Sequence, residues 1–323
     1  KSLSGKQSII ITSSVTENIF AVNPDLSLNS LTAISISAAT LYSGNTDVSL
    51  LIPPTLWTSS TGSFSIIAKN NTGNLGSGAY ALVAGKSNTA STYSFVGNGF
   101  RNYASGGSFS AIVTGKQNRA AYRYSFIGTG SANTTSSRFS TILNGIKNYI
   151  SISNSVYSTI LCGQENFISG SRNIVVGGLK NSAITTYGII LNGYSNVLSS
   201  NTHFSAILGG SGNTMIKSTL SLIGQGKSNL INPINTSKYV TLLNGFSNRI
   251  YGQYSSYSFL GGGSNNKIGG QNQIILNGQR NVITGTGFFS SIINGRDNII
   301  YNNGSNGSPF IGNGSGNTIL GSD

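Results

Sequence analysis

Acidic, histidine and cysteine side chains are too scarce in this chain to build a catalytic centre of a common type. The 323 residues include 6 Asp and Glu, 1 His and 1 Cys. Acid-base cleavage of glycosidic bonds needs two neighbouring carboxylates. Beyond residue 77 the carboxylates are Glu165, Asp297 and Asp323. The first two should lie on the order of 40 Å apart if the repeats described below stack like strands. We therefore predict no catalytic residue.

The same scarcity argues against a metal, a cofactor and a covalent nucleophile. His203 is the only histidine, so a Ser-His-Asp arrangement lacks its acid nearby. His203 and Cys162 together are too few for a zinc site. Calcium-binding nonapeptide repeats need Asp in each turn, and glycine-rich phosphate loops need a strand–loop–helix context. We predict that the protein is not an enzyme, and that His203 is a surface or interface residue.

Cationic side chains are the stronger candidates for a binding role. Their excess gives a formal net charge of +13, which favours anionic partners such as lipopolysaccharide, teichoic acid or sulfated glycan. Eight of them lie between Gly and Asn of a repeated Gly-x-x-Asn motif, and stacked units would align them as a basic stripe. The stripe comprises Lys86, Arg101, Lys116, Lys147, Lys180, Lys227, Arg280 and Arg296. The alternative is that a turn simply keeps a charge solvated. Nucleic acid is disfavoured because the chain has no known nucleic-acid-binding module.

The Gly-x-x-Asn motif organises most of the chain. It occurs fifteen times in one register, from Gly85 to Asn317, at intervals of 14 to 19 residues. An aliphatic residue stands three positions before each Gly, and an aromatic-Ser pair often stands six before it. Self-similarity at a fixed period is typical of solenoids. We predict a structural turn ladder that includes Gly115, Asn118, Gly145, Asn148, Gly193, Asn196, Gly245, Asn248, Gly295 and Asn298.

Each unit contains two short β-prone runs and a turn. Asn-Gly pairs such as Asn144-Gly145 favour tight turns, and the density of Gly, Asn and β-branched residues disfavours helix. About 15 residues cannot bury their own face, but they can form one coil of a stack. We therefore predict an all-β fold, a parallel β-solenoid (β-roll) of about fifteen coils over residues 78–323. Its aliphatic residues would point inward, and its Asn side chains would satisfy backbone groups of the turns.

Such a coil has a thin interior, and the chain has more apolar side chains than that interior can hold. The recurring aromatics and the second aliphatics, such as Leu143, Leu161, Leu191 and Leu208, are the excess. Large exposed apolar stripes usually mark an interface, so we expect a homotrimer of parallel rods. The alternative is a wider single-chain coil with the aromatics inside.

The unit resembles the head repeats of trimeric autotransporter adhesins of the YadA type. The segment from Phe139-Ser140 through Gly145 to Ile150 matches those repeats, with Asn in place of their Ser and Ile in place of their Ala. The resemblance covers residues 78–323 and implies a left-handed β-roll trimer. The repeat is also similar to those in fibre proteins of phages and large viruses. Those adhesins carry a coiled-coil stalk and a membrane barrel, whereas this chain shows no heptads, which favours a virion or an assembled appendage.

Residues 1–77 lack the repeat and hold three of the six acidic residues. Their alternating apolar runs predict a small β domain that caps the first coil or docks onto a partner. No run of about 18 apolar residues occurs, so we expect no membrane insertion.

These observations favour an extracellular fibre or appendage protein, on a virion or a cell. It would attach to a cell surface through anionic glycans as a homotrimer. The alternative is a purely structural subunit of an extracellular filament without a receptor. An ice-binding solenoid is least supported, because no column of Thr repeats.

Overall fold

The computed structural model describes residues 73–321 except 107, 152–154, 254 and 305–306, with short pieces before them. Those pieces are 42–43, 46–47, 57–59, 61 and 65–68. The chain divides into two units, Lys1–Trp57 and Thr58–Asp323. In the first unit, β1 (Tyr42–Ser43) pairs antiparallel with β2 (Thr46–Asp47). The rest of the predicted capping or docking domain lies mostly outside the described residues.

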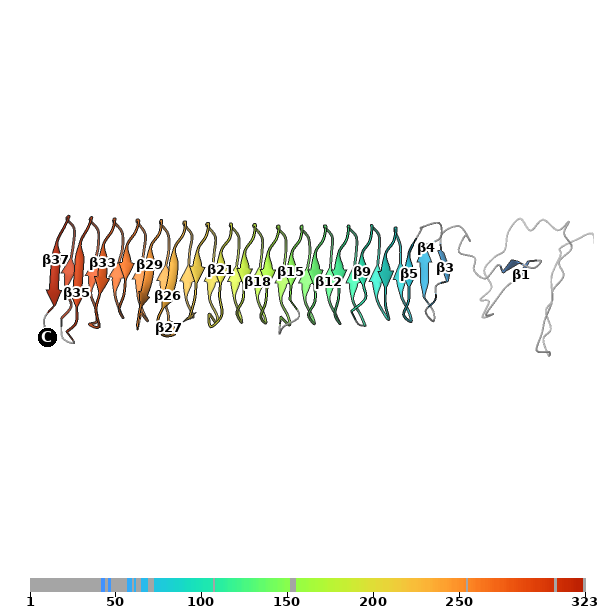
Figure 1. The fold of residues 1–323 in the computed structure, drawn as a ribbon, viewed down its shortest axis with the longest axis horizontal. Helices are drawn as coiled ribbons and strands as arrows, with labels where there is room; N and C mark the ends of the chain where they lie inside the picture. Colours follow the sequence, from blue (N-terminus) through green and yellow to red (C-terminus); the bar gives the residue numbers. More distant parts are fainter. Residues whose placement is uncertain are drawn as a thin grey trace, which may run out of the picture. The chain divides into compact units, whose positions relative to one another are not determined.

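The second unit is a parallel β-solenoid, which confirms the predicted fold class. Figure 1 shows its coils stacked side by side as a straight rod, each coil contributing one strand to each of two ladders. Pairing is parallel and in register, so that Ile142 pairs with Ile160 and Ile150 with Ile168. Each strand is very short because the chain must turn twice in about 15 residues.

The first ladder is called sheet B below. It consists of β4 (Ile66–Ala68), β6 (Leu82–Val83), β8 (Phe95–Val96), β10 (Ala111–Ile112), β12 (Phe126–Ile127), β14 (Thr141–Ile142), β16 (Thr159–Ile160), β18 (Ile174–Val175), β20 (Ile189–Ile190), β22 (Ala206–Ile207), β25 (Leu222–Ile223), β28 (Thr241–Leu242), β30 (Phe259–Leu260), β32 (Ile274–Ile275), β34 (Ser291–Ile292) and β36 (Phe310–Ile311).

The second ladder, sheet C, has sixteen strands. It consists of β5 (Leu75–Gly76), β7 (Thr89–Ala90), β9 (Tyr103–Ala104), β11 (Arg119–Ala120), β13 (Thr134–Thr135), β15 (Tyr149–Ile150), β17 (Phe167–Ile168), β19 (Ser182–Ala183), β21 (Val197–Leu198), β23 (Thr214–Met215), β26 (Leu230–Pro233), β29 (Arg249–Gly252), β31 (Lys267–Ile268), β33 (Val282–Thr284), β35 (Ile299–Asn302) and β37 (Thr318–Gly321). β3 (Trp57–Ser59) pairs with β4 and belongs to sheet B, whereas the pair β24 (Ser218–Thr219) and β27 (Ser237–Lys238) lies outside both ladders.

The core is a double column of aliphatic side chains, one from each strand of a coil. Ile142 and Ile150, for example, are both fully buried, and their equivalents in the neighbouring coils stack above and below them. The interior is therefore as thin as the repeat predicts. The early coils use Ala in the sheet C column, as at Ala90 and Ala104, where the later coils use Ile.

The solenoid begins one coil earlier than the repeat motif indicates. Strands β4 and β5 pair with β6 and β7, so the two ladders reach back before residue 78. The Oδ1 atom of Asn74 accepts the backbone N–H of Asn88 at 3.0 Å, as Asn side chains do in the later coils. The position three residues before Asn74 holds Asn71 instead of Gly. The motif search therefore missed this coil, although Asn74 lies at the right spacing.

One edge of the rod is a column of stacked Gly turns, called the Gly-turn edge. At Gly145 the backbone has φ 121°, and an added Cβ would lie 2.2 Å from the carbonyl oxygen of Gly163 in the next coil. Only glycine fits a turn that combines positive φ with such close stacking. The repeated Gly is thus required by the distance between neighbouring coils.

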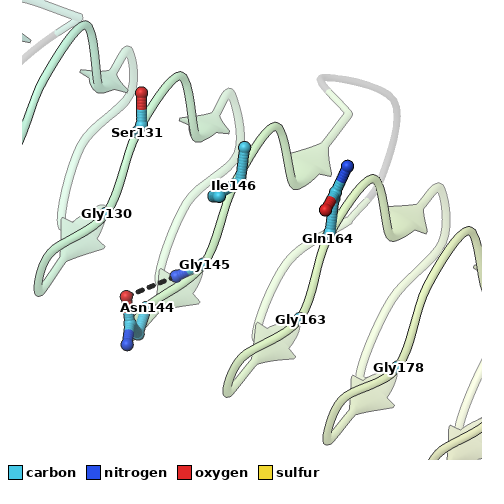
Figure 2. Close-up of a pocket in the computed structure, with 8 residues that line it drawn as sticks. All are labelled: Gly130, Ser131, Asn144, Gly145, Ile146, Gly163, Gln164 and Gly178. Atoms are coloured by element: carbon cyan, nitrogen blue, oxygen red, sulfur yellow. Dashed lines mark hydrogen bonds between the residues drawn. The ribbon is translucent and has the colours of Figure 1, made fainter.

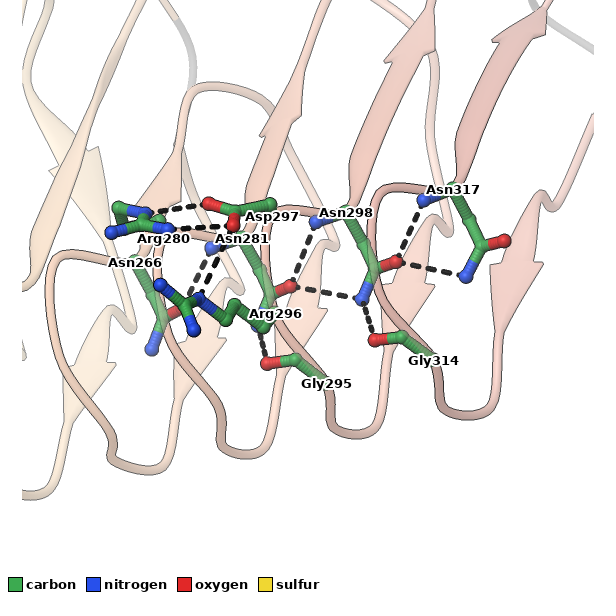
Figure 3. Close-up of polar contacts among 9 residues, drawn as sticks. All are labelled: Asn266, Arg280, Asn281, Gly295, Arg296, Asp297, Asn298, Gly314 and Asn317. Carbon is green, nitrogen blue, oxygen red and sulfur yellow. Dashed lines mark hydrogen bonds and ion pairs between the residues drawn. The ribbon is translucent and has the colours of Figure 1, made fainter.

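The Asn of each motif lies inside this turn and links it to the next coil. Asn148 is fully buried; its Nδ2 donates to the carbonyl of Gly163 at 2.9 Å, and its Oδ1 accepts the N–H of Asn166 at 3.0 Å. Figure 3 shows the same ladder near the C-terminal end, where Asn298 contacts Gly314 and Asn317. The Oδ1 atoms thus give acceptors to backbone N–H groups that would otherwise lack partners, and the Nδ2 atoms are second donors to carbonyls that also accept a backbone N–H.

Candidate binding and assembly surfaces

Groups that could do chemistry are scattered over the rod. Glu165 and Asp297 follow Gly163 and Gly295 in different coils, far apart along the stack. His203 is exposed beside a shallow hollow that contains hydroxyl side chains and no carboxylate, and Cys162 is exposed and free. Within the described residues, no group of three His, Cys, Asp or Glu side chains could hold a metal ion. The part of the chain that the structure describes also has no helix long and apolar enough to cross a membrane.

The eight residues of the predicted basic stripe all lie exposed on the Gly-turn edge. They occupy two adjacent columns rather than one. Lys86, Lys116, Lys227 and Arg296 follow the Gly directly and form bridges between coils. Arg101, Lys147, Lys180 and Arg280 stand one residue later, with φ between 54° and 59°. Several coils between them carry only uncharged residues at both positions.

Both described acidic residues of the solenoid lie within this stripe and neutralise part of it. The Nζ of Lys180 is 3.7 Å from Glu165, and the Nε atoms of Arg280 and Arg296 are 2.5 Å and 3.3 Å from Asp297. Figure 3 shows the side chains of both arginines reaching the Asp297 carboxylate. Hydrogen bonding from Arg280, with its positive charge, lowers the pKa of Asp297. The hydrogen bond from Gln164 is the main cause of the lowered pKa of Glu165.

A shallow open groove follows the Gly column. Its floor near the middle of the rod is the glycine backbone of neighbouring coils, and its walls are Asn144 on one side and a line of Ser131, Ile146 and Gln164 on the other (Figure 2). No lining residue of this stretch is charged. The groove therefore offers amide and hydroxyl groups but no charge that would hold an anion.

The outer surface of sheet B, called the flat face, carries no charged residue along the described strands from β4 to β36. Its side chains are those directly before and after the inward-facing residue of each of these strands. The residues before it are Ile66, Leu82, Phe95, Ala111, Phe126, Thr141, Thr159, Ile174, Ile189, Ala206, Leu222, Thr241, Phe259, Ile274, Ser291 and Phe310. The residues after it are Ala68, Ala84, Gly97, Val113, Gly128, Leu143, Leu161, Val176, Leu191, Leu208, Gly224, Leu243, Gly261, Leu276, Ile293 and Gly312. An uncharged sheet surface of this length is unusual on a protein exposed to water.

Large and small residues compensate each other across the flat face. Each of its four phenylalanines is followed two positions later by glycine, on the same side of the sheet. At Gly97 an added Cβ would lie 2.9 Å from the ring of Phe95. At Gly261 the corresponding distance to the ring of Phe259 is 3.2 Å. The ring thus lies over its glycine, and the face keeps a nearly even height.

The edge opposite the Gly turns carries the recurring aromatics and is called the aromatic edge. These residues turn the chain with positive φ, as Phe139 does at 52°, and they are exposed. The alternative of a wider coil with the aromatics inside is therefore wrong. Six rings from Tyr80 to Tyr157 stack without a break, with neighbouring centroids 4.8 to 5.2 Å apart. Stacking of neighbouring rings is energetically favourable. It offsets part of the free-energy cost of the left-handed backbone conformation at a bulky residue.

Cations accompany these rings, and the sequence reasoning missed them. Arg123, Arg138 and Lys238 directly precede aromatic residues of the edge and are exposed. Arg172 takes an aromatic position, with its guanidinium 5.7 Å from the ring centroid of Tyr157 and 5.1 Å from that of Tyr187. The signal was present in the sequence as a basic residue before the aromatic-Ser pair.

Comparison of the sequence with protein-family models and with curated proteins finds no match.

Proposed function

We propose that this chain is the rod of an extracellular fibre or appendage, which assembles with copies of itself and attaches to a cell surface through anionic glycans. The observation that supports self-assembly best is the flat face. It is mostly apolar and carries no charge, and the rings of Phe95, Phe259 and Phe310 lie beside the glycine two positions later, which keeps the face even. Exposed side chains such as Leu143, Leu191 and Leu243 would leave water on contact with a second rod.

The size of the flat face suits a stable interface. Sixteen strands at about 4.8 Å give a length of roughly 70 Å, and two outward residues per strand give a width of roughly 10 Å. The face therefore covers roughly 700 Å², close to the roughly 800 Å² that each partner contributes to a standard protein–protein interface. It also exceeds the roughly 300–600 Å² of the largest apolar patch on a typical monomer.

The sequence favours an assembly of three copies, and the shape of the flat face is also compatible with a pair. A homotrimer of parallel rods would turn the three flat faces toward a common axis. Two flat sheets can instead pack face to face about 10 Å apart, and each then covers the other completely. Both arrangements bury the flat face, so one set of variants on that face tests self-assembly in either case. The native mass gives the number of chains in the assembly.

The test of self-assembly is the mass of the full chain in solution, by analytical ultracentrifugation. Wild type should sediment near three times the chain mass of 33.5 kDa, or twice it for a face-to-face pair. Substituting Leu143→Glu, Leu191→Glu and Leu243→Glu together should give a monomer, because three charges cannot be buried unpaired. The matched control places Glu on sheet C, at the outward-facing Thr134, Ser182 and Thr214.

The control triple should keep the wild-type mass. A wild-type chain that is monomeric at all concentrations would overturn the proposed assembly. A mass that grows without limit with concentration would favour the alternative, a filament subunit without a receptor. If that chain also fails to bind anionic glycans, it has the properties expected of a filament subunit without a receptor.

A further inference from the structure

We propose that the anionic polymer binds along the aromatic edge, with Arg123, Arg138 and Arg172 as its main contacts, and not along the Gly-turn stripe. This inference rests on the proposed attachment through anionic glycans and assigns its site. The partner that fits is a linear sulfated or carboxylated glycan lying parallel to the axis of the rod.

Acidic residues are distributed unequally between the two edges of the rod. Within the described residues of the second unit, the acidic side chains are Glu165 and Asp297, and both lie on the Gly-turn edge. They pair there with Lys180, Arg280 and Arg296. The aromatic edge carries cations and no acidic residue in that part of the chain, so an approaching polyanion meets attraction without local repulsion.

The three arginines of the aromatic edge lie at short intervals along the axis of the rod. The N–H of Phe139 donates to the carbonyl of Arg123 at 3.4 Å, and that of Tyr157 donates to Arg138 at 3.3 Å, which places the two arginines in one column on consecutive coils. Arg172 follows two coils later. By strand stacking the three lie at intervals of about 5 and 10 Å. Guanidinium groups bind sulfate and carboxylate bidentately, so this series matches charges repeated along an extended chain.

The stacked rings of the aromatic edge leave their edges, and not their faces, accessible to a ligand. Tyr124 and Phe139 stack with their planes only 5° apart, so each ring face is covered by its neighbour. The edges that remain carry the positive part of the ring quadrupole. Such edges attract anionic groups. They offer no free face on which a nucleic-acid base could stack, and base stacking supports much of the binding of single strands.

Two of the three arginines, Arg138 and Arg172, are also held in place by rings. The Arg172 guanidinium lies between Tyr157 and Tyr187, and that of Arg138 is 5.9 Å from the centroid of Tyr122. Cation–π contacts of this kind restrict a long side chain. Less conformational freedom is then lost when the glycan binds.

The experiment measures binding of the full chain to immobilised heparin, a sulfated glycan, at several salt concentrations. The test variant combines Arg123→Gln, Arg138→Gln and Arg172→Gln. We expect at least a roughly tenfold loss of affinity and a shallower dependence on salt, because charge-assisted hydrogen bonds are removed.

The control variant combines Arg101→Gln, Lys147→Gln and Lys227→Gln on the Gly-turn edge. It lowers the net charge by the same three units and leaves the ion pairs of that edge intact. We expect less than about a threefold change. All six residues are exposed, so both variants should keep the wild-type melting temperature.

Each outcome decides the matter. A larger loss in the control variant would return the site to the Gly-turn stripe and overturn the proposal. Equal losses would mean that only net charge matters, which also overturns it. Tighter binding of single-stranded DNA than of heparin, lost in the test variant, would replace the glycan by nucleic acid. If the wild type binds no sulfated or carboxylated glycan, the proposed attachment to glycans is itself overturned. The proposed self-assembly is tested separately, by ultracentrifugation of the flat-face variants.

Discussion

The ring of Phe259 lies over Gly261, two residues further along the chain. An added Cβ at residue 261 would be 3.2 Å from the ring and 2.5 Å from the carbonyl oxygen of Leu276 in the next coil. The same contact between ring and glycine recurs at Phe95 and Phe310, and Phe126 also has a glycine two positions later. The flat face therefore depends on a size compensation within each coil and on close contact between coils.

Replacing Gly261 by alanine should destabilise the rod, because the new methyl group meets backbone of the next coil. Overpacking of this kind costs about 1–3 kcal/mol. The matched change is Gly262→Ala, where the nearest atom, Oδ1 of Asn277, would be 3.8 Å away. Its effect should stay within about 0.5 kcal/mol. Denaturant midpoints of the two variants give the comparison, and equal midpoints would contradict the packing argument.

Replacing Thr135 by valine should stabilise the protein. Thr135 occupies the core column between Ala120 and Ile150, and its Oγ1 is buried without a hydrogen-bond partner. A buried hydroxyl left unpaired costs about 1–3 kcal/mol, so valine should recover about 1 kcal/mol. The neighbouring Thr134 faces outward, and Thr134→Val should have little effect. Thermal unfolding checks the pair, and a lower melting temperature for Thr135→Val would sink the idea.

The two asparagines flanking Gly145 should differ sharply in their contribution to stability. Asn148→Ala leaves the buried N–H of Asn166 without an acceptor and removes one of two donors to the carbonyl of Gly163, which keeps the N–H of Ile146. We expect a loss of roughly 3 kcal/mol. Asn144 only accepts the N–H of Gly145 at an exposed position, so Asn144→Ala should cost less than about 1 kcal/mol. Chemical denaturation measures both, and a larger loss for Asn144→Ala would contradict the ladder.

Acid should weaken the C-terminal part of the Gly-turn edge. Hydrogen bonding and charge from Arg280 lower the pKa of Asp297 in the folded protein below the ordinary value of 3.8. A lowered folded pKa means that the carboxylate stabilises the fold above the unfolded pKa, and that this contribution is lost as pH falls through the folded pKa. Asp297→Asn should therefore narrow the difference in melting temperature between pH 7 and pH 2. An unchanged difference would mean that the ion pair contributes nothing, as many exposed pairs do.

The repeat was sufficient to determine the solenoid, its short strands, its buried aliphatic columns and its glycine turns. Each of these follows from local requirements: positive φ at Gly145, alternation around Ile142, and an amide at Asn148 where backbone groups need partners. A coil of about 15 residues has few other ways to bury its apolar side chains. The missed first coil shows the limit of motif matching, because Asn74 keeps its role although Asn71 replaces the glycine.

Only the tertiary structure decided which columns face outward and what they meet there. The sequence shows Glu165 and Lys180 fifteen residues apart, whereas stacking places them in adjacent coils as an ion pair. It shows aromatic residues at regular spacing, but the backbone turn at each one decides that Tyr124 and Phe139 stack outside rather than inside. Side chains from different coils meet through the register of the ladders, and that register depends on the length of every intervening loop.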